Sequence, residues 1–302
     1  VFTSANPFSF KDIITDLDNQ ESEEVFGNLT FPENASEKDS TIYPLIIGVA
    51  GSLGWAKHHY DYLKMYREMD IATFELNSFK SRGISSTVGS QVSVTTAMMI
   101  LDSYRAFEIL SKHPQINADK VAITGWSLGG AVTLFSSWIP LKNAINKDLK
   151  FAAHLAFYPP CFVSPEILDF TDSPIHILIG EMDNWTPAAA CEELVPEMQK
   201  KGFDIGLTVY KNSHHSFDRE GQIEFIESGY SFTDCRLNMR GDGAILMNFL
   251  SIPMTTPFLQ KVGLAFCAER GVRYGGNPEA KEKAFQFARE FMNRNLLIGT
   301  TP

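Results

Sequence analysis

The sequence predicts an α/β fold in which a mostly parallel central sheet carries helices on both faces. Short runs that are apolar on both sides alternate with longer amphipathic segments along most of the chain. A strand buried on both faces is continuously apolar, and strands that alternate with helices form parallel sheets with right-handed crossovers. The length of 302 residues and the 44% hydrophobic content fit one large globular domain over residues 1–302.

Each element is predicted from its own pattern of apolar residues. The expected strands are 25–31, 44–50, 70–76, 120–124, 151–158, 175–179 and 206–210. The expected helices are 55–69, 92–113, 129–138, 188–201 and 280–297, each with apolar residues at helical spacing. The polar and acidic residues 1–24 should form an N-terminal arm on the surface. Residues 218–278 lack a clear strand–helix unit, so we expect an insertion before the last helix and a candidate cap.

The charge and the hydropathy of the chain exclude some classes of binding partner. Lysine and arginine total 26 against 36 aspartate and glutamate residues, which gives a net charge of −10. An acidic chain without a basic run is a poor binder of nucleic acid or anionic lipid. No apolar stretch approaches the roughly 18–20 residues that a membrane span needs. We therefore expect a small-molecule partner, and the oligomeric state stays open.

The start of the chain and the four cysteines bear on location. The first residue is Val1 instead of Met, which fits a removed signal peptide. An even number of cysteines fits two disulfides in an oxidising compartment, and without a CxxC pair a zinc site is not favoured. We expect a secreted or periplasmic protein, with a cytoplasmic protein that has four buried thiols as the alternative.

The pentapeptide Gly125-Trp-Ser-Leu-Gly129 has the pattern G-x-S-x-G. A predicted strand leads into it and a helix of small residues leads out, which is the arrangement of a nucleophile elbow. Such a tight turn brings backbone segments so close that side chains at the two glycines would clash. The elbow would expose the hydroxyl of Ser127 at the carboxyl edge of the sheet, which makes it the candidate nucleophile.

A serine hydroxyl needs a base, and in this type of fold the acid and the base follow the serine along the chain. His214 and His215 come directly after the last predicted strand, and His215 is the preferred base. His154 and His176 lie inside predicted strands, where we expect core histidines.

The acid should come from the same edge of the sheet, because open α/β sheets place their sites at the carboxyl ends of strands. Asp183 follows strand 175–179 and is the preferred acid. Asp183 could also be a helix cap, and Glu181 or Asp172 could take its place as the acid.

The backbone amides of Leu128 and Ser52 are the expected oxyanion donors, with Leu53 as the alternative to Ser52. Three tryptophans lie beside the catalytic loops, namely Trp55, Trp126 and Trp185. They either line a substrate pocket or pack in the core. The adjacent His58 and His59 should point apart on one helix, so we expect neither a metal nor another cofactor. These residues complete the set of site candidates.

The order of these motifs resembles the α/β-hydrolase superfamily, and specifically the dienelactone hydrolase family. The matching stretches are 51–55, 77–83, 125–130, 180–187 and 215–218, within residues 25–220, together with the final helix. The resemblance implies an α/β-hydrolase fold with Ser127 as nucleophile and Asp183 as acid. It also implies His215 as base, because the family has His-x-Phe at this point.

The sequence departs from the family in three places. The namesake enzymes use cysteine as the nucleophile, and serine at position 127 favours ordinary ester hydrolysis. The usual His-Gly before the oxyanion loop is Ala50-Gly51 here. The insertion is longer than in minimal members, so we carry over neither a substrate pocket nor a substrate-binding arginine.

The expected fold also suggests a pairing of the cysteines. Cys161 follows the strand after the elbow and Cys191 opens the helix after the acid loop, so both should lie near the carboxyl edge. We predict a disulfide between them that braces the loop of the acid. Cys235 and Cys267 would then form a second disulfide within the insertion, although four cysteines allow three connectivities.

Together these features predict a serine carboxylic-ester hydrolase that acts on a small ester or lactone through an acyl-enzyme. A serine peptidase or amidase of the same superfamily is the first alternative, because related folds host both activities. A hydrolase-like binding protein without catalysis is the second alternative.

Overall fold

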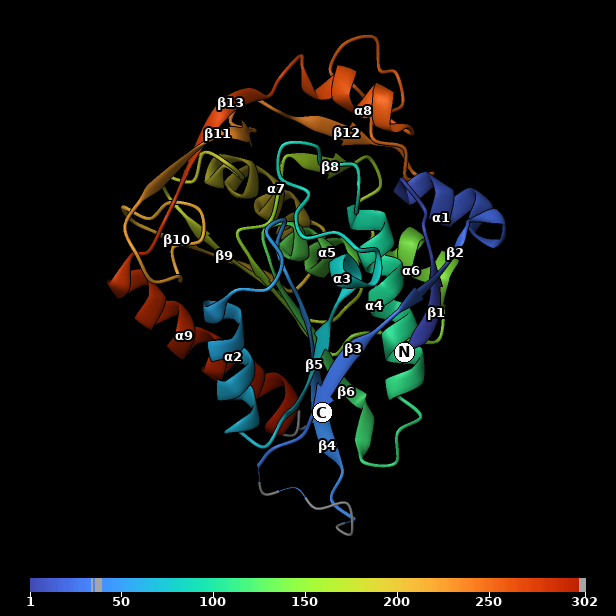
Figure 1. Ribbon diagram of the computed structural model, residues 1–302, viewed down its shortest axis with the longest axis vertical. Coiled ribbons are helices and arrows are strands. Elements are labelled where there is room, and N and C mark those ends of the chain that lie inside the picture. Colours follow the sequence, from blue (N-terminus) through green and yellow to red (C-terminus); the bar gives the residue numbers. More distant parts are fainter. Residues whose placement is uncertain (34, 36–39, 299–302) are drawn as a thin grey trace.

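A central sheet of seven strands runs through the described part of the molecule, in the order β10-β9-β7-β6-β4-β5-β3 (Figure 1). The computed structural model describes residues 1–33, 35 and 40–298. The strands are β3 (Gly27–Thr30), β4 (Tyr43–Val49), β5 (Ala72–Leu76), β6 (Ile116–Trp126), β7 (His154–Phe157), β9 (Ile175–Gly180) and β10 (Ile205–Tyr210). Neighbouring strands pair in parallel except at β3, which is antiparallel to β5. The predicted mostly parallel sheet is confirmed.

Helices cover both faces of this sheet, as predicted (Figure 1). On one face α2 (Lys57–Arg67) packs against α9 (Pro278–Met292), and on the other face α4 (Thr96–Leu110) packs against α5 (Leu128–Phe135). The helix α7 (Ala188–Lys200) packs along β10 at one edge. The short helices are α1 (Phe10–Asp16), α3 (Ser78–Ser81) and α6 (Ile139–Ile145). Within the described ranges, no helix combines the length and the apolarity that crossing a membrane requires.

The apolar runs of the sequence form the core. Leu45, Ile46 and Ile47 of β4 are all inaccessible to solvent, so both faces of this strand are buried. Burial on both faces explains why the run lacks the alternation of apolar and polar residues that a half-exposed strand has.

The N-terminal segment differs from the expected surface arm. The strands β1 (Phe2–Ala5) and β2 (Ser22–Val25) pair with each other, and α1 lies between them in the chain. Phe10 and Ile13 of α1 are buried, and the ring of Phe10 lies 5.5 Å from that of Phe135 on α5. The few apolar residues of this acidic stretch face the core together, which draws the whole segment into the domain.

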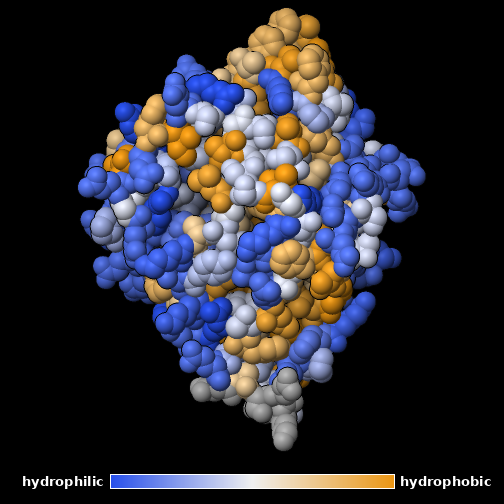
Figure 2. Space-filling view, in the orientation of Figure 1, coloured by the Kyte–Doolittle hydropathy of each residue, from blue (hydrophilic) through white to orange (hydrophobic). Residues whose placement is uncertain are grey.

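The insertion 218–278 has a small architecture of its own. Its strands β11 (Glu224–Ser231) and β13 (Glu269–Tyr274) pair with each other, whereas β12 (Leu237–Met239) pairs with β8 (Val163–Pro165) of the sheet domain. With α8 (Pro257–Leu264) the insertion lies over β8 at one end of the molecule (Figure 1). Figure 2 shows apolar side chains gathered at this end, where Phe249, Leu250, Phe258 and Phe266 are exposed.

Two disulfides each join segments within one part of the molecule. One joins Cys161 to Cys191, and the other joins Cys235 to Cys267 inside the insertion. This is the pairing that we predicted from the sequence. The two bonds are compatible with an oxidising, extracellular environment.

Candidate active site

Ser127 lies in the turn between β6 and α5, with the strained backbone of a nucleophile elbow. Its φ of 56° and ψ of −112° are rare for a residue with a side chain. Its amide donates a hydrogen bond of 2.9 Å to the carbonyl of Phe157, which holds the turn against β7. A Cβ at Gly129 would lie 2.1 Å from the carbonyl oxygen of Val49, and one at Gly125 would lie 2.2 Å from that of Gly129. Only glycine fits at both positions.

His215 lies beside Ser127, and its neighbour His214 does not. The Nε2 atom of His215 is 2.9 Å from the hydroxyl oxygen of Ser127. The rings of Tyr158 and Trp185 lie 4.7 Å and 4.9 Å from the imidazole and bury it almost completely. His214 instead faces the backbone carbonyl of Met182, 3.1 Å from its Nδ1.

The buried carboxylate of Asp183 orients His215 from the other side. Its Oδ2 lies 2.7 Å from Nδ1 of His215, and its Oδ1 accepts the amides of Trp185 and Thr186 at 2.9 Å each. A carboxylate can only accept here, so Nδ1 carries the proton and Nε2 is free to accept the proton of the Ser127 hydroxyl. The other two candidate acids lie elsewhere. Asp172 pairs with Lys150 in an exposed ion pair, and Glu181 accepts the amide of Asn212.

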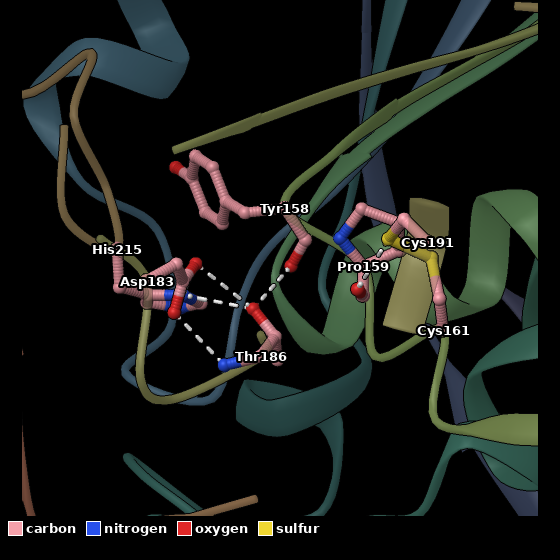
Figure 3. Close-up of a disulfide and its surroundings, with 7 residues drawn as sticks. All are labelled: Tyr158, Pro159, Cys161, Asp183, Thr186, Cys191 and His215. Atoms are coloured by element: carbon pink, nitrogen blue, oxygen red, sulfur yellow. Dashed lines mark hydrogen bonds and ion pairs between the residues drawn. A yellow bond between two sulfur atoms is a disulfide. The ribbon is translucent and has the colours of Figure 1, made fainter. Parts of the chain in front are cut away.

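Thr186 is a member of the site that sequence reasoning missed (Figure 3). Its hydroxyl oxygen is 3.0 Å from Oδ2 of Asp183, 3.1 Å from Nδ1 of His215 and 3.0 Å from the carbonyl oxygen of Tyr158. One hydroxyl therefore joins the acid, the base and the loop after β7. The only signal in the sequence is its position three residues after the aspartate, just before the proline that begins α7.

The disulfide Cys161–Cys191 lies behind this network (Figure 3). It ties the loop after β7, which includes Tyr158, to the first turn of α7, which is separated from Thr186 by Pro187 alone. The loop after β7 and the loop of the acid are thereby linked covalently as well as by the hydrogen bond from Thr186 to the carbonyl of Tyr158.

Asp218 forms a second buried carboxylate site below the imidazole. It accepts hydrogen bonds from the hydroxyl of Tyr158 at 2.9 Å and from the indole Nε1 of Trp126 at 3.1 Å. Burial, together with the nearby Asp218 carboxylate, raises the pKa of Tyr158, which keeps the phenol protonated as a donor. Asp218 thus joins the residue before Ser127 to the ring that packs on His215. The sequence included it in a motif without assigning it a role.

The expected oxyanion donors lie at the same turn. A Cβ at Gly51 would be 3.3 Å from Cβ of Ser127, which places the loop of Ser52 directly against the elbow. Ser52 and Leu128 both line the space next to Ser127. Within the described residues neither amide donates a hydrogen bond to the chain, so both are available to a ligand.

Two cavities meet at Ser127. The charged cavity, of about 410 Å³, includes His215, Lys57, Asp61, Arg219 and Lys281 in its lining. The apolar cavity, of about 160 Å³, lies between α5, the loop after β7 and the insertion.

The three tryptophans named from the sequence differ in their placement. Trp126 lines the charged cavity and Trp185 lines both cavities. Trp55 is absent from the described lining of either one. Its indole Nε1 donates to the carbonyl of Leu76 and its ring stacks on Tyr60, so it packs on the end of β5.

We expected the rings of His58 and His59 to point apart, and this prediction is wrong. The ring centroids are 4.0 Å apart. The Nδ1 atom of His59 accepts the amide of Ala56 and its ring stacks on Trp126, which turns it back along the helix toward His58. Burial lowers the pKa of both imidazoles and favours their neutral forms. Among the described residues, no group of three or more His, Cys, Asp or Glu side chains is placed to hold a metal ion.

The sheet order, the serine elbow and the position of the site at the strand ends define an α/β-hydrolase. A sequence model of the dienelactone hydrolase family matches residues 72–234, more than half of the chain. The chain belongs to the dienelactone hydrolase family.

One curated relative is a probable 2-oxo-3-(5-oxofuran-2-ylidene)propanoate lactonase of Bradyrhizobium sp, 25% identical over 142 residues. The match covers 44% of this chain and 56% of the relative, so the chain spans about half the length of that protein.

Two solved structures show the same fold. A dienelactone hydrolase-like promiscuous phosphotriesterase from metagenomic libraries is 14% identical, with a TM-score of 0.57 over 98% of this chain and 99% of that chain. A thermophilic esterase of Thermogutta terrifontis with propionate bound is 17% identical, with a TM-score of 0.52 over 66% of this chain and 87% of that chain.

Proposed function

We propose that this protein is a carboxylic-ester hydrolase in which Ser127, His215 and Asp183 form a catalytic triad. The observation that carries the proposal is the continuous hydrogen-bonded chain from the serine hydroxyl through the imidazole to the buried carboxylate, with distances of 2.9 Å and 2.7 Å. The substrate class is a small ester or lactone, which agrees with the names of the lactonase and esterase relatives.

In the first half of the reaction, the hydroxyl oxygen of Ser127 attacks the ester carbonyl while Nε2 of His215 takes its proton. The amides of Leu128 and Ser52 hold the negative oxygen of the tetrahedral intermediate. As the intermediate collapses, the imidazolium gives its proton to the alkoxide, the alcohol leaves and an acyl-enzyme remains. Water then attacks the acyl group with His215 as base, which releases the acid and restores the serine.

Asp183 fixes the tautomer of His215 and stabilises the imidazolium that forms in each half-reaction. Its second oxygen is held by two backbone amides, so the carboxylate cannot rotate away from the imidazole without breaking both hydrogen bonds. The backbone strain at Ser127 serves the same end, because the positive φ presents the hydroxyl to the base.

The arrangement also supports a proposal for the whole chain. Residues 1–302 form one hydrolase domain, and 218–278 act as its cap. The two disulfides favour a secreted or periplasmic location over a reducing compartment.

The test is the variant Ser127→Ala, with Ser85→Ala as a control at an exposed serine. We expect kcat for p-nitrophenyl acetate to fall by about 10⁵-fold or more in Ser127→Ala, with an unchanged circular dichroism spectrum. A fluorophosphonate should label the wild type and Ser85→Ala but not Ser127→Ala. Labelling of Ser127→Ala at the wild-type rate would refute the assignment, and faster cleavage of an anilide than of the matched ester would make the protein an amidase.

A further inference from the structure

The apolar cavity beside Ser127 contains no charged side chain among its described lining residues. Most of its walls are aromatic and aliphatic, including Phe135, Phe162, Phe232, Leu237, Met254 and Leu264, and the rest include hydroxyl and amide side chains such as Thr95 and Gln260. These six apolar side chains are almost entirely buried, whereas Phe8, Gln91 and Gln260 of the same lining are partly exposed, so the cavity has an apolar interior and an open mouth.

The insertion supplies much of this wall. Phe232, Met254 and Leu264 all belong to residues 218–278, and the ring of Phe232 stacks on Phe162 at 4.6 Å. The disulfide Cys235–Cys267 joins the two ends of the segment that includes Met254 and Leu264. The match to the dienelactone hydrolase family covers residues 72–234, so Met254 and Leu264 lie outside it.

The position of His215 decides which part of an ester each cavity receives. His215 must hand its proton to the departing alcohol, so the alcohol lies on the side of the imidazole. Ser127 lines both cavities, but only the charged cavity is also lined by His215 and Arg219, and only the apolar cavity is also lined by Leu128. The apolar cavity is therefore on the acyl side of the scissile bond.

We infer that the apolar cavity binds the acyl group, and that the substrate is an ester of an apolar carboxylic acid with a polar alcohol portion. This inference rests on the proposed ester hydrolysis. The cavity volume of about 160 Å³ sets the size of the acid. An apolar cavity of about 150 Å³ in another protein holds one benzene molecule. The acyl groups that fit have about four to six carbons or a single aromatic ring.

The first test compares two series of esters with the wild-type enzyme. In p-nitrophenyl esters from acetate to dodecanoate, kcat/KM should rise by about two- to fourfold per methylene, as burial of each methylene implies, and fall beyond about six carbons. In acetate esters of primary alcohols from methanol to hexanol, kcat/KM should change by less than about threefold in total. A rise along the alcohol series with a flat acyl series would overturn the assignment of the two sides.

The second test changes the cavity itself at Leu264 of α8. Leu264→Phe should fill it and lower kcat/KM for hexanoate at least tenfold while acetate changes by less than threefold. Leu264→Ala should move the preferred chain length upward. Phe258→Ala is the matched control, because Phe258 is on the same helix but is 73% exposed and does not line the cavity. If Leu264→Phe fails to fold, Met254→Ala tests the same wall by enlargement.

The outcomes separate this inference from the proposed function. A wild-type enzyme that cleaves no ester and takes no fluorophosphonate label contradicts the proposed function. A wild-type enzyme that cleaves acetate and hexanoate equally, with Leu264→Phe slowing both by the same factor, contradicts only the acyl site.

Discussion

The catalytic framework and the insertion are built by different means. In the framework Ser127, Asp183 and His215 come just after β6, β9 and β10 of one sheet, and hydrogen bonds between buried groups hold them in place. The insertion has one strand pair of its own, one shared strand pair, a disulfide and both apolar and polar contacts. It also exposes large apolar side chains such as Phe249 and Phe258.

From this difference we expect a division of roles, in which the framework carries out the reaction and the insertion selects the ester. Rigid strand ends position the groups that react, and a segment outside the sheet can vary without disturbing them. Changes in the framework should therefore slow every ester by a similar factor, whereas changes in the insertion should alter which ester is preferred. The predictions below test this division, beginning with the largest expected effect.

Asp183→Asn should reduce kcat by about 10⁴-fold, because an amide neither stabilises the imidazolium nor selects the tautomer that a carboxylate selects. The change keeps the shape of the side chain, so the fold should survive. Steady-state rates on acetate and hexanoate esters should fall by the same factor, and Asp172→Asn at an exposed ion pair is the control. A loss below tenfold would remove Asp183 from the triad.

The two disulfides allow a direct comparison of the two regions. They enclose similar lengths of chain, with sequence separations of 30 and 32 residues, so each should stabilise the fold by about 2–4 kcal/mol. Cys161→Ser with Cys191→Ser should loosen the loop of Thr186 and lower kcat for both acetate and hexanoate. Cys235→Ser with Cys267→Ser should leave acetate within twofold and weaken the preference for hexanoate. Equal effects of the two pairs on chain-length preference would contradict the division.

The same division explains what the sequence could predict. The elbow and the strand ends are local patterns, so Ser127, Asp183 and His215 could each be chosen from a few neighbouring residues. The disulfide pairing followed once the fold placed Cys161 and Cys191 at one edge.

Features that depend on contacts between distant segments were missed. Phe10 meets Phe135 only after the chain has folded, and this contact turned the expected surface arm into part of the core. The hydrogen bond between Thr186 and Tyr158 joins residues 28 positions apart, and that between Trp126 and Asp218 joins residues 92 positions apart. No pattern in the sequence predicts either bond. The apolar cavity needs α5, the loop after β7 and the insertion together, so no single segment could reveal it.

The histidines of the framework predict how stability depends on pH. Burial lowers the pKa of His154 and of His176 to about 4, and the insertion contains no histidine. The unfolded chain, with ordinary histidines, binds these protons first, so the stabilisation is complete above about pH 6.5 and is lost as the pH falls toward 4. Each histidine should cost on the order of 2 kcal/mol of unfolding free energy between pH 7 and pH 5.

Urea unfolding at the two pH values measures this loss. His176→Gln should reduce this loss by on the order of 2 kcal/mol, because glutamine does not titrate and can still hydrogen-bond to Thr208 in place of the imidazole. His113→Gln, in the turn between α4 and β6, serves as the control. A pH dependence that is unchanged in His176→Gln would place the acid sensitivity outside this pair of histidines.

Thr186→Val should have the smallest effect, a fall in kcat of about tenfold. The substitution keeps the shape of the side chain but removes the hydroxyl, whose one proton can be donated either to Oδ2 of Asp183 or to the carbonyl of Tyr158. Because Thr186 acts through the acid, acetate and hexanoate should slow equally and KM should stay nearly constant. Thr186→Ser should restore most of the rate, since it returns the hydroxyl. A shift in chain-length preference in Thr186→Val would show that the framework also takes part in selecting the acyl group, because Thr186 lines the apolar cavity as well.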